Sequence, residues 1–256
     1  MRLAARRWPA PQGARASVVL VHGFSASGSE ERVITLAEAL HANGYGVLAY
    51  DARGHGASGG DCTLGDRERL DIDAAVRAAQ SDRTSNTTSN ATANRTSDVT
   101  SDSTSGVGLP IVVVAASMGA IAALGYEHDT PGQIRGLVTV SCPAHWRLPR
   151  NGRGLASVVL TQTPVGRWFA RRQMNVRIAR RLHRPAPPVE LIAHVGVPIA
   201  ILHGRNDPFI SPAAADDLFA AAHDPRSKVI VENMGHAYEP ESIAPVVAAV
   251  AWILTA

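Results

Sequence analysis

Three side chains that together can cleave an acyl bond each stand just after a short apolar stretch of the chain. They are Ser117, Asp207 and His236. A serine hydroxyl becomes a nucleophile when a base takes its proton, and an imidazole oriented by a carboxylate is a common base for this purpose. The chain therefore contains, in the order serine, acid, histidine, the side chains that nucleophilic acyl transfer needs.

The sequence around Ser117 predicts an abrupt change from strand to helix. Residues 111–114 are β-branched and do not alternate with polar residues, as in a strand buried on both faces of a parallel sheet, whereas residues 116–124 indicate a helix. Ala115 and Gly119 have no bulky side chain, so the backbone has room to turn. We expect an exposed hydroxyl above the first amides of the helix, where an oxyanion can bind. Close packing of small residues is the simpler alternative.

Two further segments carry a resemblance to a known family. One is His22-Gly23-Phe24 after an apolar run, and the other is residues 51–58, Asp-Ala-Arg-Gly-His-Gly-Ala-Ser. Together with the order serine, acid, histidine, they resemble the α/β-hydrolase superfamily, most closely its monoacylglycerol-lipase-like and serine-peptidase-like branch. The resemblance covers nearly all of the chain outside residues 80–108 and 143–190.

The resemblance implies a fold and a set of roles. The fold is α/β, a doubly wound and mostly parallel sheet with helices on both faces and a small helical cap, in one domain over residues 1–256. Ser117 would attack the carbonyl, His236 would take and return the proton, and Asp207 would orient the imidazole. The backbone amides of Phe24 and Met118 would form the oxyanion hole.

The chain departs from the family pattern at two places. Ala115 stands where the family usually has glycine, and its methyl group crowds the turn slightly. Only seventeen residues precede Val18, where the family usually has a β-hairpin, so one edge strand is expected to be missing or the start to be internal. Asp216 and Asp217 lie on the following predicted helix and stay open as alternatives to Asp207.

The resemblance implies a cofactor-free serine esterase that acts on a small-molecule acyl ester. An acyl thioesterase, a carbon–carbon-bond hydrolase and a cofactor-free haloperoxidase use the same triad and stay open as alternatives. Haloalkane dehalogenases and epoxide hydrolases are disfavoured, because they have an aspartate where this chain has Ser117. The alternative from another class is a catalytically silent binding protein of the same fold.

Alternation of predicted strands and helices supports a doubly wound sheet, with ligands at the carboxyl ends of the strands. Strands are predicted near residues 17–22, 45–50, 110–116, 135–141, 197–203 and 228–232. Helices are predicted at residues 30–41, 66–79, 117–127, 212–222 and 242–254.

The composition suits a single compact domain, with 45% apolar residues among 256. The sequence shows neither an apolar run long enough to span a membrane nor a secretory signal, so we expect a cytoplasmic protein. A formal net charge of +3 is too small to indicate a nucleic-acid partner.

Cysteines and histidines do not indicate a metal site. Cys62 and Cys142 are too few for a disulfide framework, so we expect free thiols. The ten histidines show no metal-ligand spacing, so no metal is expected. His22 and His203 each precede a glycine at a predicted strand end, where hydrogen bonds to the loop backbone are expected, and the same holds for His55.

Two segments break the alternation. Residues 80–108 are rich in Ser, Thr and Asn and nearly free of apolar residues, so they predict a disordered surface insertion. Residues 143–190, the cap segment, contain ten arginines and no acid before Glu190. A basic, partly aromatic lid could make peripheral contact with an anionic membrane or receive an anionic acyl thioester. The chain has 24 arginines and one lysine, however, which favours a solvated surface of arginine-rich composition.

Overall fold

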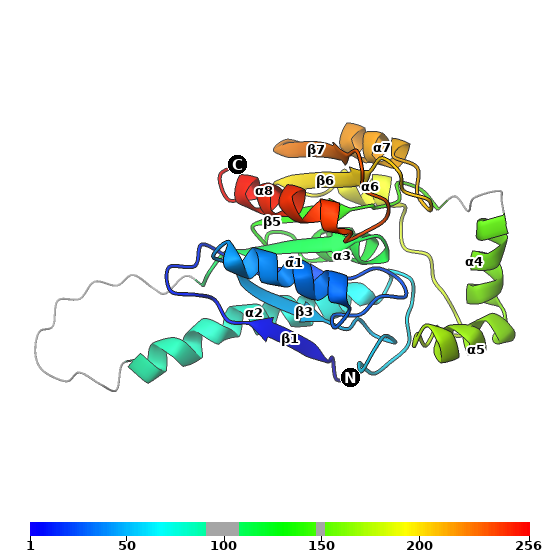
Figure 1. The fold of residues 1–256 in the computed structure, drawn as a ribbon, viewed down its shortest axis with the longest axis horizontal. Helices are drawn as coiled ribbons and strands as arrows, with labels where there is room; N and C mark the ends of the chain where they lie inside the picture. The colour runs from blue at the N-terminus through cyan, green and yellow to red at the C-terminus, as the bar shows by residue number, and fades with distance from the viewer. Residues whose placement is uncertain (91–107, 147–151) are drawn as a thin grey trace, which may run out of the picture.

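The computed structural model describes residues 1–90, 108–146 and 152–256. Its centre is a seven-stranded sheet in the order β1-β3-β2-β4-β5-β6-β7 (Figure 1). β1 pairs with β3 in antiparallel fashion, and all the other pairs are parallel. The strands are β1 (Ala5–Trp8), β2 (Ser17–Val21), β3 (Gly46–Tyr50), β4 (Ile111–Ala116), β5 (Gly136–Val140), β6 (Ile199–Gly204) and β7 (Arg226–Val231).

Helices cover both faces of the sheet. On the near side in Figure 1 lie α1 (Glu31–Ala42) and α8 (Ile243–Ile253), preceded by the 3-10 turn η1 (Pro240–Ser242). The other face packs against α2 (Glu68–Asn90), α3 (Met118–Asp129), α6 (Pro188–Ile192) and α7 (Ala213–Ala221). The pair α4 (Gly152–Gln162) and α5 (Pro164–Gln173) stands at one edge of the molecule. Among the described residues, none of these helices is both long and apolar enough to cross a membrane.

The two apolar cores explain why the central strands do not alternate with polar residues. In β4, Ile111 and Val113 pack into the core under α2 and α3, whereas Val112 and Val114 pack into the core under α1 and α8. A strand covered on both faces needs apolar side chains at every position. This two-layer burial confirms the predicted α/β sheet.

The chain differs from the prediction at the N-terminal edge of the sheet. β1, with the sequence Ala-Arg-Arg-Trp, was not expected, yet it pairs with β3 from Ala5↔Tyr50 to Trp8↔Val47. Its first three residues are exposed. An edge strand with no fully buried face lacks the apolar pattern by which the other strands were predicted.

Helix α2 is longer than the sequence predicts. It continues from Glu68 to Asn90, so residues 80–90 of the predicted insertion are helical. The first glycine or proline after residue 80 is Gly106, so no helix-breaking residue stops the helix at the point where its composition changes. Residues 91–107 lie outside the described residues, and disorder there stays a prediction.

The chain returns from α5 to the sheet along the loop between β3 and α2. The Cys62 amide donates to the Arg177 carbonyl at 2.6 Å, and the Arg177 amide donates to the Gly54 carbonyl at 2.7 Å. Gly54 has φ 74, and a Cβ there would overlap the Cys62 amide nitrogen and the Arg177 carbonyl oxygen. The Arg177 guanidinium donates to the carbonyls of Ser58 and Gly60. One arginine of the cap segment is therefore a structural residue.

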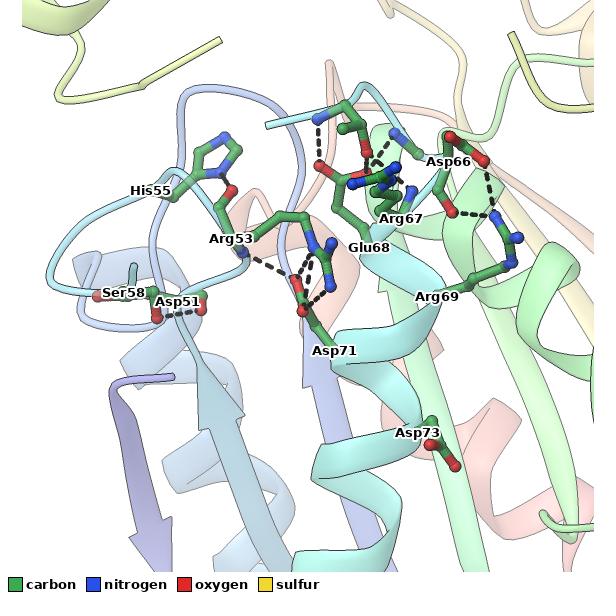
Figure 2. A network of polar contacts seen from close by, with 12 residues as sticks. Asp51, Arg53, His55, Ser58, Asp66, Arg67, Glu68, Arg69, Asp71 and Asp73 are labelled. Carbon is green, nitrogen blue, oxygen red and sulfur yellow. Dashed lines mark hydrogen bonds and ion pairs between the residues drawn. The ribbon is translucent and has the colours of Figure 1, made fainter. Parts of the chain in front are cut away.

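A buried ion pair ties the same loop to α2 (Figure 2). Arg53 Nη2 donates to Asp71 Oδ1 at 2.7 Å, and the Arg53 amide donates to Asp71 Oδ2 at 2.8 Å. The Arg53 side chain is 12% exposed and that of Asp71 only 1%. One turn earlier, Glu68 accepts from the Thr63 amide and hydroxyl at 2.6 Å each. The two carboxylates of α2 thus fix the loop that connects the carboxyl end of β3 to α2.

We expect Asp71→Ala to lower the free energy of unfolding by about 3 kcal/mol, because it leaves a largely buried guanidinium without its counter-charge. Asp73→Ala is the matched control on the same helix, since Asp73 pairs with an exposed Arg77 side chain. The control should cost under about 1 kcal/mol. Urea denaturation of both variants measures the difference, and equal costs would contradict a structural role for the buried pair.

Candidate active site

Ser117 occupies a strained turn between β4 and α3. Its backbone lies at φ 50 and ψ −117, a region that residues other than glycine rarely adopt. The Ser117 amide donates to the Val140 carbonyl at 2.9 Å, and its own carbonyl accepts from the Ala120 amide at 3.0 Å. The turn is therefore held by the neighbouring strand on one side and by the first turn of α3 on the other.

Two glycines make room for this turn. A Cβ on Gly119 would lie 2.5 Å from the His22 carbonyl oxygen, and a Cβ on Gly23 would lie 3.2 Å from Ser117 Cβ. The end of β2 and the start of α3 thus approach each other too closely for a side chain at position 119. The family's first glycine is replaced by Ala115, which is fully buried within β4.

The structure joins Asp207 to His236. The His236 Nδ1 lies 2.7 Å from Asp207 Oδ2, and the other carboxylate oxygen accepts from the amides of Phe209 and Ile210 at 2.8 and 2.9 Å. An ionised carboxylate only accepts, so the contact favours the tautomer of the neutral ring in which Nδ1 carries the proton and Nε2 keeps its lone pair. The ring of Phe209 packs edge-on against the imidazole at 5.1 Å.

The two other candidate acids lie elsewhere. Asp216 Oδ1 is 2.5 Å from Lys228 Nζ, and Asp217 Oδ2 is 3.2 Å from His145 Nε2. Neither pairs with His236 in the described part of the chain. The geometry therefore favours Asp207 as the acid.

Asp207 is kept ionised by its neighbours. Burial by itself would raise the pKa of Asp207, but contacts with His203 and His236, the charge of His236 and the Ile210 amide outweigh it and hold the pKa well below its ordinary value. His203 Nε2 lies 3.0 Å from the Ile210 carbonyl and 3.5 Å from Asp207 Oδ2. His203 therefore binds loop backbone, as predicted, and also faces the acid, which was not predicted.

The loop that carries His236 crosses the ends of several strands. The Tyr238 hydroxyl lies 2.9 Å from the carbonyls of both Val21 in β2 and Val114 in β4. The Ala237 amide donates to Ser141 Oγ, just after β5, at 3.2 Å. These contacts hold the histidine loop above the central strands, on the side where Ser117 stands.

Glu239 holds the same loop from the other side. Its carboxylate accepts from the Gly235 amide at 2.6 Å and from the His236 amide at 3.3 Å, and it faces Arg32 at 3.7 Å. The sequence did not single out Glu239, because a glutamate three residues after a histidine has no distinguishing pattern. Its contacts with the Gly235 and His236 amides form only when the loop is folded.

Ser117 and His236 line two adjacent cavities, with Phe24 in the wall of both. The larger cavity, of about 600 Å³, contains Ser117, and the smaller one, of about 340 Å³, contains His236. Within the described residues, no hydrogen bond joins the serine hydroxyl to the imidazole. Such contacts are often long in enzymes without substrate and tighten when substrate binds.

The amides expected to bind an oxyanion are available. Among the described residues, neither the Phe24 nor the Met118 N–H has a hydrogen-bond acceptor, and both residues line the 600 Å³ cavity with Ser117. The Met118 amide belongs to the first residue of α3, where the helix dipole favours negative charge.

His22 fixes the loop that carries Phe24. Its Nε2 accepts from the Ala52 amide at 2.9 Å, so its Nδ1 carries the proton that faces the Gly23 carbonyl at 2.8 Å. Burial, and secondarily the neighbouring His55 ring, lower the pKa of His22 to about 4. His22 is therefore a neutral, structural histidine, and His55 likewise contacts loop backbone, the Arg53 carbonyl, at 2.9 Å.

The remaining candidate ligands do not gather. No group of three or more His, Cys, Asp or Glu side chains could hold a metal ion among the residues the structure places. Cys62 and Cys142 are free and buried, as expected, and burial raises the pKa of both thiols.

Comparison with protein families matches residues 12–183 to the family described as serine aminopeptidase, S33. This stretch contains the Ser117 turn, the Phe24 loop and most of the cap segment. The chain belongs to this family of α/β-hydrolases. Asp207 and His236 lie beyond the matched residues, so their pairing rests on the geometry above.

Two relatives are themselves uncharacterized. YnbC of Escherichia coli K12 is 36% identical over 142 residues, which are 53% of this chain and 20% of that protein. Rv2307c of Mycobacterium tuberculosis H37Rv is 27% identical over 236 residues, 92% of this chain and 68% of that protein. The chain thus spans about a fifth of the first relative and about two thirds of the second.

Solved structures share the fold along the whole chain. The Pyrococcus furiosus esterase Pf2001 has a TM-score of 0.66 at 18% identity, covering 99% of this chain and 92% of that one. The monoacylglycerol lipase of Paleococcus ferrophilus has a TM-score of 0.65 at 20% identity, covering 100% and 99%. These likenesses establish the α/β-hydrolase fold.

We expect His22 to make folding acid-sensitive. Its pKa lies below the ordinary value in the folded state, so the unfolded chain binds the proton first, and stability falls as pH drops from about 6.5 toward 4. The His22 contribution is about 3 kcal/mol between about pH 7 and pH 4. Urea denaturation of the wild type and of His22→Gln, which keeps a donor and an acceptor without titrating, measures it. An identical pH slope in both proteins would contradict a buried neutral His22.

Proposed function

We propose that this protein is a serine hydrolase that cleaves a carboxylic ester of a small molecule through an acyl-enzyme. The observation that carries the proposal is the Ser117 turn, which places this serine in the wall of the 600 Å³ cavity, immediately before Met118, the first residue of α3. A strained backbone at a non-glycine residue persists only when the surroundings hold it, and such residues cluster at active sites.

The reaction follows from the three side chains. His236 Nε2 takes the Ser117 proton while the serine oxygen adds to the ester carbonyl, and the amides of Phe24 and Met118 stabilise the oxyanion. His236 then returns the proton to the leaving alkoxide, so that an alcohol departs and an acyl-serine remains. Water, deprotonated by the same imidazole, then adds to the acyl-serine, and as the acid product departs the imidazolium returns the proton to the serine oxygen. Asp207 stabilises the imidazolium in both halves, and no cofactor enters the balance.

The larger cavity suits an apolar acyl group. Its walls near Ser117 include Leu64, Met118 and Ile121, and the cap segment adds Trp146 and Leu160. An apolar pocket binds hydrocarbon by removing its surface from water. We infer that the acyl chain lies here, between the sheet's carboxyl edge and the cap segment. The presence of Trp146 and Leu160 in the cavity wall supports the interpretation of this segment as a cap.

We expect Ser117→Ala to lower the turnover of a p-nitrophenyl ester by at least roughly 10⁴-fold, because the nucleophile is lost while the fold stays intact. Circular dichroism and thermal unfolding check the fold, and release of p-nitrophenol measures the rate. Residual activity within about tenfold of wild type would contradict the assignment.

We expect Asp207→Asn to lower the turnover by on the order of 10⁴-fold, because an amide no longer stabilises the imidazolium or its tautomer. Asp216→Asn is the matched control, since Asp216 contacts Lys228 and not His236. The control should keep wild-type turnover. If the two variants behaved alike, Asp207 would not be the acid.

A further inference from the structure

The exposed face of α5 is apolar, the reverse of what a surface helix normally shows. Val165, Trp168 and Phe169 are 73, 62 and 48% exposed. They recur at the spacing i, i+3, i+4, so they lie in one stripe along the helix, and Arg172 continues the stripe at i+7. Two aromatic side chains of a ten-residue helix therefore face solvent together.

The opposite face of α5 is formed by small residues that fix its orientation. Gly166 and Ala170 are buried. A Cβ on Gly166 would overlap the Val159 carbonyl of α4, so the two helices pack in direct backbone contact there. The helix begins at a defined cap, with the Gly166 amide donating to Thr163 Oγ1 at 3.0 Å. The helix cannot turn its aromatic stripe inward without losing this packing.

Positive charge accompanies the stripe. Arg171 and Arg172 are exposed in the last turn of α5. Arg167 is directed back toward the carbonyls of Thr161 and Gln162, at 3.4 and 3.3 Å. Residues 143–189 contain no aspartate or glutamate, so the sequence around α5 supplies no acidic side chain to balance this charge.

The stripe stands next to the candidate active site. Leu160, Thr161 and Gln162, at the end of α4, line the 600 Å³ cavity, and α5 begins directly after them. Figure 1 shows α4 and α5 at the edge of the molecule, beyond the sheet and its covering helices. A surface that contacts α5 would therefore lie beside the wall of the cavity.

We propose that the stripe Val165, Trp168 and Phe169, with Arg171 and Arg172, docks on the surface of an anionic lipid bilayer. Tryptophan and phenylalanine enter the boundary between headgroups and acyl chains, and neighbouring arginines pair with anionic headgroups. Apolar side chains next to positive charge favour an anionic bilayer over a second copy of this chain. In a dimer formed through this stripe, the arginines of the two copies would lie close together and repel each other. An apolar substrate could then pass from the lipid into the cavity without crossing water.

The test measures binding of the full chain carrying Ser117→Ala to vesicles, so that its outcome does not depend on the proposed hydrolysis. We expect binding to vesicles of phosphatidylcholine with phosphatidylglycerol, and weaker binding to phosphatidylcholine alone. Val165→Ser, Trp168→Ser and Phe169→Ser together should weaken binding at least about tenfold, because binding scales with the apolar area that enters the interface. Arg171→Gln with Arg172→Gln should weaken binding to the anionic vesicles roughly fivefold per arginine.

Leu70→Ser is the matched control, because Leu70 is an apolar side chain of similar exposure, 53%, on α2. It should leave vesicle binding unchanged. Absence of binding in the parent protein, or binding that survives the triple substitution, would overturn the proposal. A dimer in analytical ultracentrifugation that the triple substitution dissociates, without vesicle binding, would overturn it in favour of a second copy.

Discussion

The close approach of β2 and α3 beneath Ser117 is the constraint on which the rest of the site depends. Ser117 lines the cavity from a turn at φ 50, and two residues later the chain comes so close to the His22 carbonyl that Gly119 has no room for a side chain. Close by, Gly23 approaches Ser117, and the next residue, Phe24, lines the same cavity as Met118, the first residue of α3. One steric requirement therefore positions the proposed nucleophile and the proposed oxyanion hole together, and His22 holds the Phe24 loop through two backbone contacts.

A balance between burial and polar contacts determines the charge state of Asp207, the proposed acid beside the proposed base His236. Burial of the Asp207 side chain by itself would raise its pKa, yet two imidazoles and two amides lower the pKa and keep the carboxylate charged. A charged, buried carboxylate is what fixes the tautomer of His236. The loop that presents the imidazole is in turn held by Tyr238 and Glu239, so the pair is preorganised before any substrate arrives.

The sequence predicts well what depends on local pattern. The buried strands, the turn at Ser117 and the loop positions of Asp207 and His236 follow from short apolar runs and the small residues beside them. The sequence assigned the acid role to Asp207 but did not exclude Asp216, and the fold favours Asp207 because, in the part of the chain that the structure describes, only Asp207 of the two pairs with His236. β1, the contact of His203 with the acid and the loop contacts of Glu239 depend on pairing across the chain, which no local pattern encodes. The sequence shows the apolar residue types of the α5 stripe, but only the structure shows that their side chains face solvent.

The most direct test of the central claim is covalent labelling with a fluorophosphonate probe, followed by peptide mapping. Such a probe reacts with a serine only when a base activates it and an oxyanion site receives the phosphonyl oxygen. The account predicts one adduct per chain, on the peptide that contains Ser117, and its loss in His236→Ala. An unlabelled protein that is folded, or an adduct on another residue, would contradict it.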